Sequence, residues 1–561
     1  MIKQLNNSWG IWALPAAGLS AHTPAGLTHR PVSAAIPNAG KRKLISVVIV
    51  FIYLFVCNIA LAQNRQISLD AAQVKGNFNR NYNFCIGAGR ANEGLRADWQ
   101  RQMREVKRIC DFKYIRFHGL LTDDMGVYRE DKAGKAIYNW QYIDELYDFL
   151  LSIKMKPFVE LGFMPNALAS GPQTVFWWKG NITPPKDYAK WNALIKALVQ
   201  HWTERYGQPE VKTWYFEVWN EPNLKDLFFS GNRDDYFKLY RETANTIKSV
   251  SMDYRVGGPA TAGNAWIPET IGFCVDNKVP IDFISTHTYG VKQGFLDQTG
   301  DVGVIVSQRK DAIYSDMQRS RLQIKQSAMP NLELHYTEWS SSYTPTDPIH
   351  DSYHQAAYIL DKIKNAAPYV TSMSYWTFTD IFEELGPRMT PFHGGFGLMN
   401  YQDIKKPAFY AYQYLSKLGD KELANTDLAS VACKDIKGSV QVLLWDFTIT
   451  HPGDSVNDQT YYKRDLPAKA IAPVTISIKN LKPGKYKMQV YRVGYRQNDA
   501  YATYMAMGSP PQLTREQVAK IKQHNNGAPI ASTIINVSAK GVIETFAMHQ
   551  NGVILVDLQK I

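Results

Sequence analysis

Residues 213–222 read Thr-Trp-Tyr-Phe-Glu-Val-Trp-Asn-Glu-Pro, an apolar and aromatic run that ends in polar residues and a proline. A short run of this composition predicts a buried β-strand. Seven further segments have a similar short, apolar composition. The eight expected strands are Phe84–Ala88, Lys113–His118, Lys156–Phe163, Thr213–Asn220, Arg255–Pro259, Asp282–Tyr289, Glu333–Trp339 and Thr371–Phe378.

Amphipathic stretches lie between or after these strands and predict helices. They are Leu95–Cys110, Trp140–Ile153, Asp187–Arg205, Tyr236–Val250, Tyr353–Ala366 and Ala408–Leu418. Alternation of strands and helices indicates parallel βαβ units, and eight units fit a closed barrel better than an open doubly wound sheet. No GxGxxG turn follows the first strand. We therefore expect an α/β protein whose residues 63–420 form a (β/α)8 TIM barrel.

The sequence pattern changes after about residue 420, where short predicted strands are separated by Gly, Pro and Asp. The expected strands are Val440–Phe447, Val474–Ile478, Tyr486–Val493, Ile530–Ile535 and Gly552–Leu558. A more helical insert is expected around Thr514–His524. This pattern predicts a β-sandwich accessory domain over residues 421–561.

The formal net charge of the 561 residues is +12, but it is spread along the chain. Five of the basic residues lie in residues 1–62, which contain no Asp or Glu, and no block of five or six like charges occurs anywhere. This distribution argues against nucleic-acid binding. The 12% of aromatic residues is instead typical of proteins with ring-stacking surfaces as well as aromatic cores.

The N-terminal 62 residues contain the three parts of a signal peptide. Lys41-Arg42-Lys43 is followed by the apolar run 44–56 and by Ala60-Leu61-Ala62. We expect export to the periplasm or the medium, a mature chain beginning near Gln63, and no stable membrane insertion after cleavage. An uncleaved membrane anchor is the alternative, because residues 44–62 approach the length that spans a bilayer.

In a barrel of this kind, catalytic groups project from the carboxyl ends of strands. Two carboxylates stand there, Glu221 after the fourth strand and Glu338 in the seventh. The two strands face each other across a barrel mouth, and a glycosidic bond is split by one protonated and one ionised carboxyl group. The flanking Trp219, Pro222 and Trp339 are expected to desolvate Glu221 and raise its pKa, as a general acid requires.

Two other function classes compete with a glycosidase. A non-catalytic carbohydrate-binding protein would keep the aromatic cleft but has no need for both carboxylates. A metalloenzyme barrel would need ligands, yet the histidines His118, His287 and His393 show no HExxH spacing. The four cysteines beyond residue 62 show no CxxC spacing either. We expect no metal, no cofactor and an oligosaccharide substrate.

Residues 214–224, Trp-Tyr-Phe-Glu-Val-Trp-Asn-Glu-Pro-Asn-Leu, resemble the acid/base strand of glycoside hydrolase family 39, the family of β-xylosidases and α-L-iduronidases. The segments 116–120, 158–165, 285–289, 336–339 and 376–384 resemble the β-xylosidase branch, and the likeness covers roughly residues 80–560. It implies an exo-acting, retaining β-D-xylosidase. Relatives acting on α-L-arabinosides, β-glucosides or α-L-iduronides are the alternatives.

The same resemblance implies roles for individual residues. Glu221 would be the acid/base, Glu338 the nucleophile of a covalent glycosyl-enzyme, and Asn220 the ligand of the sugar 2-hydroxyl. Either Glu383 or Glu384 would accept hydrogen bonds from other hydroxyls. The remaining residues of the subsite for the nonreducing xylose would be His118, His287, Tyr289, Tyr343 and Trp376.

Overall fold

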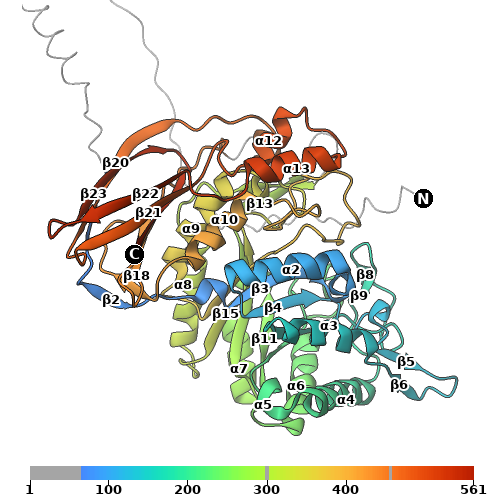
Figure 1. Ribbon diagram of the computed structural model, residues 1–561. Helices are drawn as coiled ribbons and strands as arrows, with labels where there is room; N and C mark the ends of the chain where they lie inside the picture. Colours follow the sequence, from blue (N-terminus) through green and yellow to red (C-terminus); the bar gives the residue numbers. More distant parts are fainter. Residues whose placement is uncertain (1–64, 297–301, 454–457) are drawn as a thin grey trace, which may run out of the picture. The chain divides into compact units, whose positions relative to one another are not determined.

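The computed structural model describes residues 65–296, 302–453 and 458–561 (Figure 1). The signal peptide expected within residues 1–62, and the alternative membrane anchor, lie outside these described residues. The segment Gln66–Ile561 forms one compact unit. Within the described ranges, none of the helices combines the length and the apolar character needed to cross a bilayer.

Eight parallel strands close into a barrel in chain order, and the last strand pairs with the first through Tyr375 and Ile86 (Figure 1). Each strand overlaps one predicted segment, so the predicted barrel is confirmed. The strands are β3 (Cys85–Arg90), β4 (Tyr114–His118), β7 (Lys156–Leu161), β10 (Tyr215–Val218), β11 (Arg255–Thr261), β12 (Phe283–Tyr289), β15 (Glu333–Ser340) and β16 (Ser372–Tyr375).

A helix follows each barrel strand in the described part of the chain. These helices are α2 (Ala97–Cys110), α3 (Gln141–Ser152), α4 (Tyr188–Tyr206), α6 (Arg233–Val250), α7 (Ile267–Asp276), α8 (Tyr314–Lys325), α9 (His354–Ala366) and α10 (Pro407–Ser416), with the short α5 (Gln208–Val211) after α4. The sequence pattern did not predict α7 and α8. Helix α7 contains Pro268 and Gly272, and α8 is largely polar and buries only Met317, Ser320 and Ile324, so their periodicity is weak.

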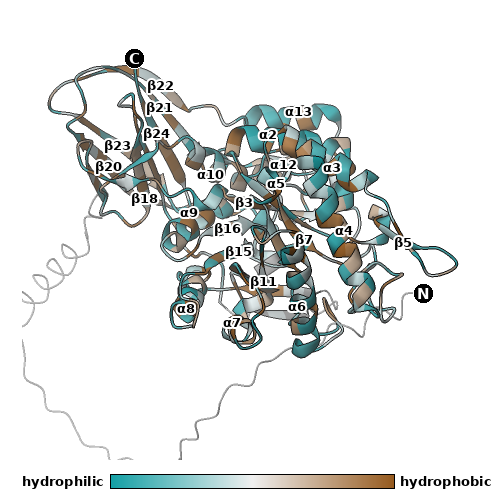
Figure 2. Ribbon diagram, turned by 90° about the horizontal axis from the view of Figure 1, so that it is seen from below, coloured by the Kyte–Doolittle hydropathy of each residue, from teal (hydrophilic) through white to brown (hydrophobic). Residues whose placement is uncertain are grey.

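The other helices present one apolar face to the barrel. In α2 the buried residues include Trp99, Met103, Val106 and Cys110, at spacings of three and four. Figure 2 shows hydrophilic and hydrophobic residues alternating along α2, α3 and α4, as expected of helices with one buried face. Helix α4 begins at Asp187, whose carboxylate accepts hydrogen bonds from the first-turn backbone amides.

The two ends of the barrel interior differ in chemistry. At the amino end of the strands, Cys85, Tyr114, Phe158, Tyr215 and Phe283 form a buried cluster. The rings of Phe158 and Tyr215 stack with centroids 4.9 Å apart. Arg116, Glu338 and His287 lie instead towards the carboxyl ends, where active sites of such barrels are built.

Two antiparallel sheets form the second core. One contains, in order, β2 (Val74–Asn77), β17 (Lys421–Leu423), β18 (Ser430–Lys434), β19 (Val440–Trp445), β24 (Val553–Lys560), β21 (Gly484–Val493) and β22 (Ala531–Val537). The other contains β1 (Arg65–Asp70), β20 (Ala470–Lys479) and β23 (Val542–His549). Their facing residues form a continuous apolar core. This is the expected β-sandwich.

The division of the chain differs from the expected one at its beginning. Strands β1 and β2 precede the barrel in sequence, yet they complete the sheets of the sandwich, and Ile67 and Leu69 of β1 are buried in its core. The alternation of polar and apolar residues in Arg65–Asp70 indicates a strand but does not predict which sheet the strand joins. The helical insert expected near residue 514 is α13 (Arg515–His524), which is preceded by α12 (Ala500–Ala506).

Three hairpins extend the loops at the carboxyl ends of barrel strands. They follow β4, β7 and β12 respectively, and consist of β5 (Tyr128–Glu130) with β6 (Ala136–Tyr138), β8 (Thr174–Val175) with β9 (Gly180–Asn181), and β13 (Val291–Leu296) with β14 (Val302–Val306).

Candidate active site

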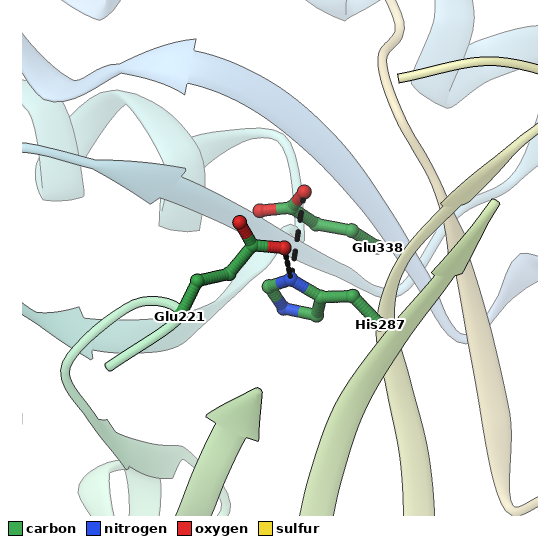
Figure 3. Close-up of side chains that lie close together, drawn as sticks. All are labelled: Glu221, His287 and Glu338. Atoms are coloured by element: carbon green, nitrogen blue, oxygen red, sulfur yellow. Dashed lines mark hydrogen bonds and ion pairs between the residues drawn. The ribbon is translucent and has the colours of Figure 1, made fainter. Parts of the chain in front are cut away.

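Glu221, His287 and Glu338 meet at the carboxyl end of the barrel (Figure 3). Glu221 follows β10, His287 lies on β12 and Glu338 lies on β15. One carboxylate oxygen of each glutamate and one ring nitrogen of the histidine lie within 4.8 Å of one another. The structure therefore brings the two predicted carboxylates together, although 117 residues separate them in the chain.

Glu338 is held by two donors, one on each carboxylate oxygen. Arg116 Nη1 donates to its Oε1 at 2.7 Å, and the hydroxyl of Tyr289 donates to its Oε2 at 2.6 Å. The side chain is almost completely buried. Hydrogen bonds and a positive charge at a carboxylate stabilise its charged form. Glu338 is thus fixed in place with both oxygens engaged.

Arg116 is the hub of this arrangement. Its side chain is fully buried, and it also contacts Glu217 through Nε, Glu160 at 2.9 Å and the amide oxygen of Asn220 at 2.9 Å. Burial opposes the charge, but the charges of Glu217, Glu160 and Glu338 together raise the pKa of Arg116. A guanidinium with its donors committed to several partners orients all of them at once. Arg116 is therefore a positioning residue.

Glu221 lies in a different environment. Burial, and next the charge of Glu338, raise the pKa of Glu221 well above its usual range. Its Oε1 lies 2.8 Å from His287 Nδ1. Burial, then the charges of Arg116 and His118, lower the pKa of His287 well below its usual range, so the imidazole is neutral. Glu221 is thus poised to hold a proton.

The backbone around Glu221 is unusual and directs its side chain. Glu221 has φ of 43° and Trp219 has φ of 72°, in the left-handed region that non-glycine residues rarely adopt. The amide of Glu221 donates to the carbonyl of Ala260 on β11 at 2.9 Å. Such strain persists where surrounding structure fixes it, and it is common at functional sites.

Two carboxylates and an imidazole within 4.8 Å also form a candidate metal site. Their surroundings do not favour a cation. The guanidinium of Arg116 occupies one oxygen of Glu338, Tyr289 occupies the other, and Thr337 lies 3.1 Å from His287 Nε2. A divalent ion here would have to displace hydrogen bonds beside a fixed positive charge. The cluster fits acid–base chemistry better.

Most of the other predicted subsite residues surround this centre. His118 Nδ1 contacts Glu160 at 2.6 Å, and its ring lies 4.8 Å from the buried ring of Trp376. Tyr343 is more peripheral, because 44% of it is exposed and its ring meets that of Tyr289 edge-on at 6.1 Å. Tyr343 thus lies at the rim rather than in the buried part of the site.

The adjacent Glu383 and Glu384 have separate roles. Glu383 is held by Arg90 at 2.7 Å and by Arg96 at 2.9 Å. Glu384 instead lies 3.8 Å from His118 Nε2. Burial, followed by the charge of Glu338, raises the pKa of Glu384 well above its usual range. Of the two alternatives, Glu384 is the one that the structure brings to the site.

Four contributors were not among the predicted site residues: Arg116, Glu160, Glu217 and Thr337. Thr337 donates to Glu217 Oε1 at 2.8 Å and so extends the network across the barrel. A signal for three of them is present in the sequence. Arg116, Glu160 and Glu217 are charged residues inside otherwise apolar strands, and such residues are rarely buried unless they are paired.

Comparison with known proteins gives a family and close relatives. The family model described as glycosyl hydrolases family 39 matches residues 65–544. A β-xylosidase of Geobacillus stearothermophilus is 38% identical over 494 residues, which cover 86% of this chain and 94% of that protein.

Two crystal structures resemble this one over 89% of the chain. The family 39 enzyme of Xanthomonas axonopodis pv. citri is 44% identical, with a TM-score of 0.86 over 98% of its length. A monomeric β-xylosidase of Caulobacter crescentus CB15 is 42% identical, with a TM-score of 0.85 over its whole length.

Proposed function

Since the chain belongs to the glycosyl hydrolases of family 39, we propose that it is an exo-acting β-D-xylosidase that releases xylose from the nonreducing ends of xylo-oligosaccharides with retention of configuration. One observation carries the proposal above all: Glu221 and Glu338 stand within 4.8 Å at the mouth of the barrel, where the pKa of Glu221 is raised and the guanidinium of Arg116 donates to Glu338. Carboxyl groups about 5 Å apart suit a retaining mechanism, whereas inverting enzymes leave room for a water between them.

The reaction proceeds in two steps. Glu338 attacks the anomeric carbon while protonated Glu221 donates its proton to the departing oxygen, and a covalent xylosyl-enzyme forms. Glu221, now ionised, then takes a proton from the water that attacks the same carbon, and Glu338 leaves. His287 lies 2.8 Å from Glu221 and is neutral, so it adds no positive charge that would hold Glu221 in its ionised form. Glu221 can therefore be protonated in the first step and ionised in the second.

The sugar is held by the groups around these carboxylates. Asn220 is oriented by Arg116 at its amide oxygen, which leaves its amide nitrogen to donate to the 2-hydroxyl. His118 lies against Trp376 and within 3.8 Å of Glu384, and Glu384 is the partner for the remaining hydroxyls. A xylose has hydroxyls but no charge, so these groups can hold it through hydrogen bonds and ring contacts alone.

Exo action is proposed from the contacts that join the loops around Glu383 and Glu384. Arg90, at the end of β3, pairs with Asp124 after β4 and with Glu383 after β16. The backbone amide of Trp177, in the loop after β7, donates to the carbonyl of Glu384 at 2.7 Å. Loops from four strands are thus joined on one side of the site, and these contacts support a subsite that ends there.

Azide rescue tests the assignment of the two carboxylates. Glu338→Ala and Glu221→Ala should both lose most activity on an aryl β-xyloside. Azide should restore turnover of the Glu338 variant with an inverted α-azide product, because it replaces the missing nucleophile. In the Glu221 variant it should give the β-azide. Glu269→Ala, at a half-exposed carboxylate on α7, is the control and should retain activity. The same β-azide from both variants would overturn the assignment.

We also propose that the enzyme is exported and that its mature chain begins near Gln63. The support is the charged, apolar and small-residue order of residues 41–62. N-terminal sequencing of the exported protein tests this. Recovery of a chain that retains residues 44–62 in the membrane fraction would contradict it and favour the anchor.

A further inference from the structure

One residue breaks the apolar row that strand β21 contributes to the interior of the sandwich. Side chains alternate along a strand, so Tyr486, Met488, Val490 and Arg492 share one face. The first three pack in the apolar core between the two sheets. Arg492 takes the fourth position, at the end of the row. A cation therefore stands where the pattern calls for an apolar residue.

A cavity of about 230 Å³ opens at this end of the sandwich. Met548 and Ile554, both members of the apolar core, contribute to its wall. The polar side chains in its lining are Arg492, Tyr495, Gln497 and His549, and no carboxylate lines it. The volume equals that of roughly eight water molecules, enough for one sugar ring.

The charge of Arg492 is poorly compensated. Its Nη2 donates to the backbone carbonyl of Ala547 at 2.8 Å, but its Nε is buried without a hydrogen-bond partner. Among the residues that the structure describes, no acidic side chain pairs with it. Asp465, near the rim, is already bound by Tyr495 and Arg496, each at 3.0 Å. Burial lowers the pKa of Arg492, with no nearby anion to offset it.

A half-buried guanidinium without a carboxylate partner is costly, and an anion in the cavity that Arg492 lines would offset its charge. The rest of the lining narrows the choice of anion. An inorganic anion would make no use of the apolar wall formed by Met548 and Ile554. A sugar ring presents a C–H face that suits such a wall, and hydroxyls that suit Tyr495, Gln497 and His549.

We propose that this cavity is a second carbohydrate site, which binds a sugar carboxylate: the carboxylate pairs with Arg492 and the ring lies against Met548 and Ile554. The binding itself is independent of the active site. Only its use depends on the proposed function, since a uronate carried as a side group on a xylo-oligosaccharide would then anchor the substrate to the accessory domain.

Saturation-transfer NMR and thermal shift with two matched ligands test the proposal. Methyl β-D-glucuronide and methyl β-D-glucoside share a ring and differ in the carboxylate. We expect the glucuronide to bind about tenfold tighter, a difference of about 1.4 kcal/mol, and to raise Tm. Methyl β-D-xyloside, a ligand for the active site, should not displace it. Inorganic sulfate should bind more weakly than the glucuronide.

Variants locate the site. Arg492→Gln should lose the preference for the glucuronide, whereas Lys485→Gln, at an exposed lysine on the same strand, should keep it. Both should hydrolyse aryl xyloside as the unmodified enzyme does. Gly494→Leu is a second test that leaves Arg492 intact: a Cβ at Gly494 meets only Gly552 at 3.5 Å, so a larger side chain is tolerated there and narrows the cavity. It should also weaken glucuronide binding.

Several results would overturn the proposal. They are equal binding of the two glycosides, sulfate binding as tight as the glucuronide, displacement by methyl β-D-xyloside, or equal losses in Arg492→Gln and Lys485→Gln. Because the readout is binding, failure of the enzyme to hydrolyse xylosides would refute the proposed function while leaving this test intact.

Discussion

Tyr289→Phe removes one oxygen atom from the site and little else. The hydroxyl of Tyr289 donates to Glu338 Oε2 at 2.6 Å; Glu338 is almost completely buried and Tyr289 is partly buried. The phenyl ring can stay against Tyr343, so packing is kept. A hydrogen bond to a charged group contributes about 1.5–3 kcal/mol, which corresponds to a loss of roughly tenfold to a hundredfold in kcat/KM.

The measurement is kcat/KM on an aryl β-xyloside, with thermal unfolding to verify that the variant is folded. Tyr343→Phe is the matched control: among the described residues its hydroxyl makes no hydrogen bond, and 44% of the residue is exposed. We expect it to stay within about twofold of the unmodified enzyme. The reasoning is refuted if Tyr289→Phe also stays within about twofold, or if the two variants lose activity equally.

Three further outcomes follow from the same contacts. Arg116→Leu should lower the free energy of unfolding by about 3–5 kcal/mol in denaturant titration, because it leaves buried carboxylates unpaired; Arg101→Leu, at an exposed arginine, should cost less than about 1 kcal/mol. Because the pKa of Glu221 is raised, the acid stays protonated, and the enzyme active, at pH values above the usual pKa of a glutamate. Activity should fall as the pH rises through the pKa of Glu221. Glu221→Ala should abolish this alkaline decrease in the profile of kcat/KM against pH. An aryl β-xyloside should be turned over at least about tenfold faster than an aryl α-iduronide, because Arg116 is already bound to three carboxylates and Asn220 and is not free to pair with the substrate's carboxylate. Equal kcat/KM values would contradict this.

The barrel was predictable because both of its periodic signals are strong. Parallel strands buried on both faces appear as short apolar runs, and Trp214–Asn220 is one of the clearest. The polar residues that follow each apolar run are then expected at the carboxyl end of the barrel. That reasoning alone selects Glu221 and Glu338, since it needs only the order of the strands.

The sequence did not predict features that depend on the path of loops or on contacts between residues far apart in the chain. Glu383 and Glu384 are adjacent, and no periodicity says which faces the sugar; Arg90 and Arg96 decide it by binding Glu383. Arg116 likewise acquires its role only when strands from across the barrel meet. The position of β1 in the sandwich is another such case, because strand pairing over some 400 residues leaves no local trace.

The most direct measurement is the mass spectrum of the enzyme treated with a xyloside that carries fluorine next to the anomeric carbon and so forms a slowly hydrolysed glycosyl-enzyme. After proteolysis we expect the label on Glu338, with retention of configuration in the products of ordinary xylosides. A label on Glu221, or no covalent adduct together with inverted products, would contradict the roles assigned to the two carboxylates.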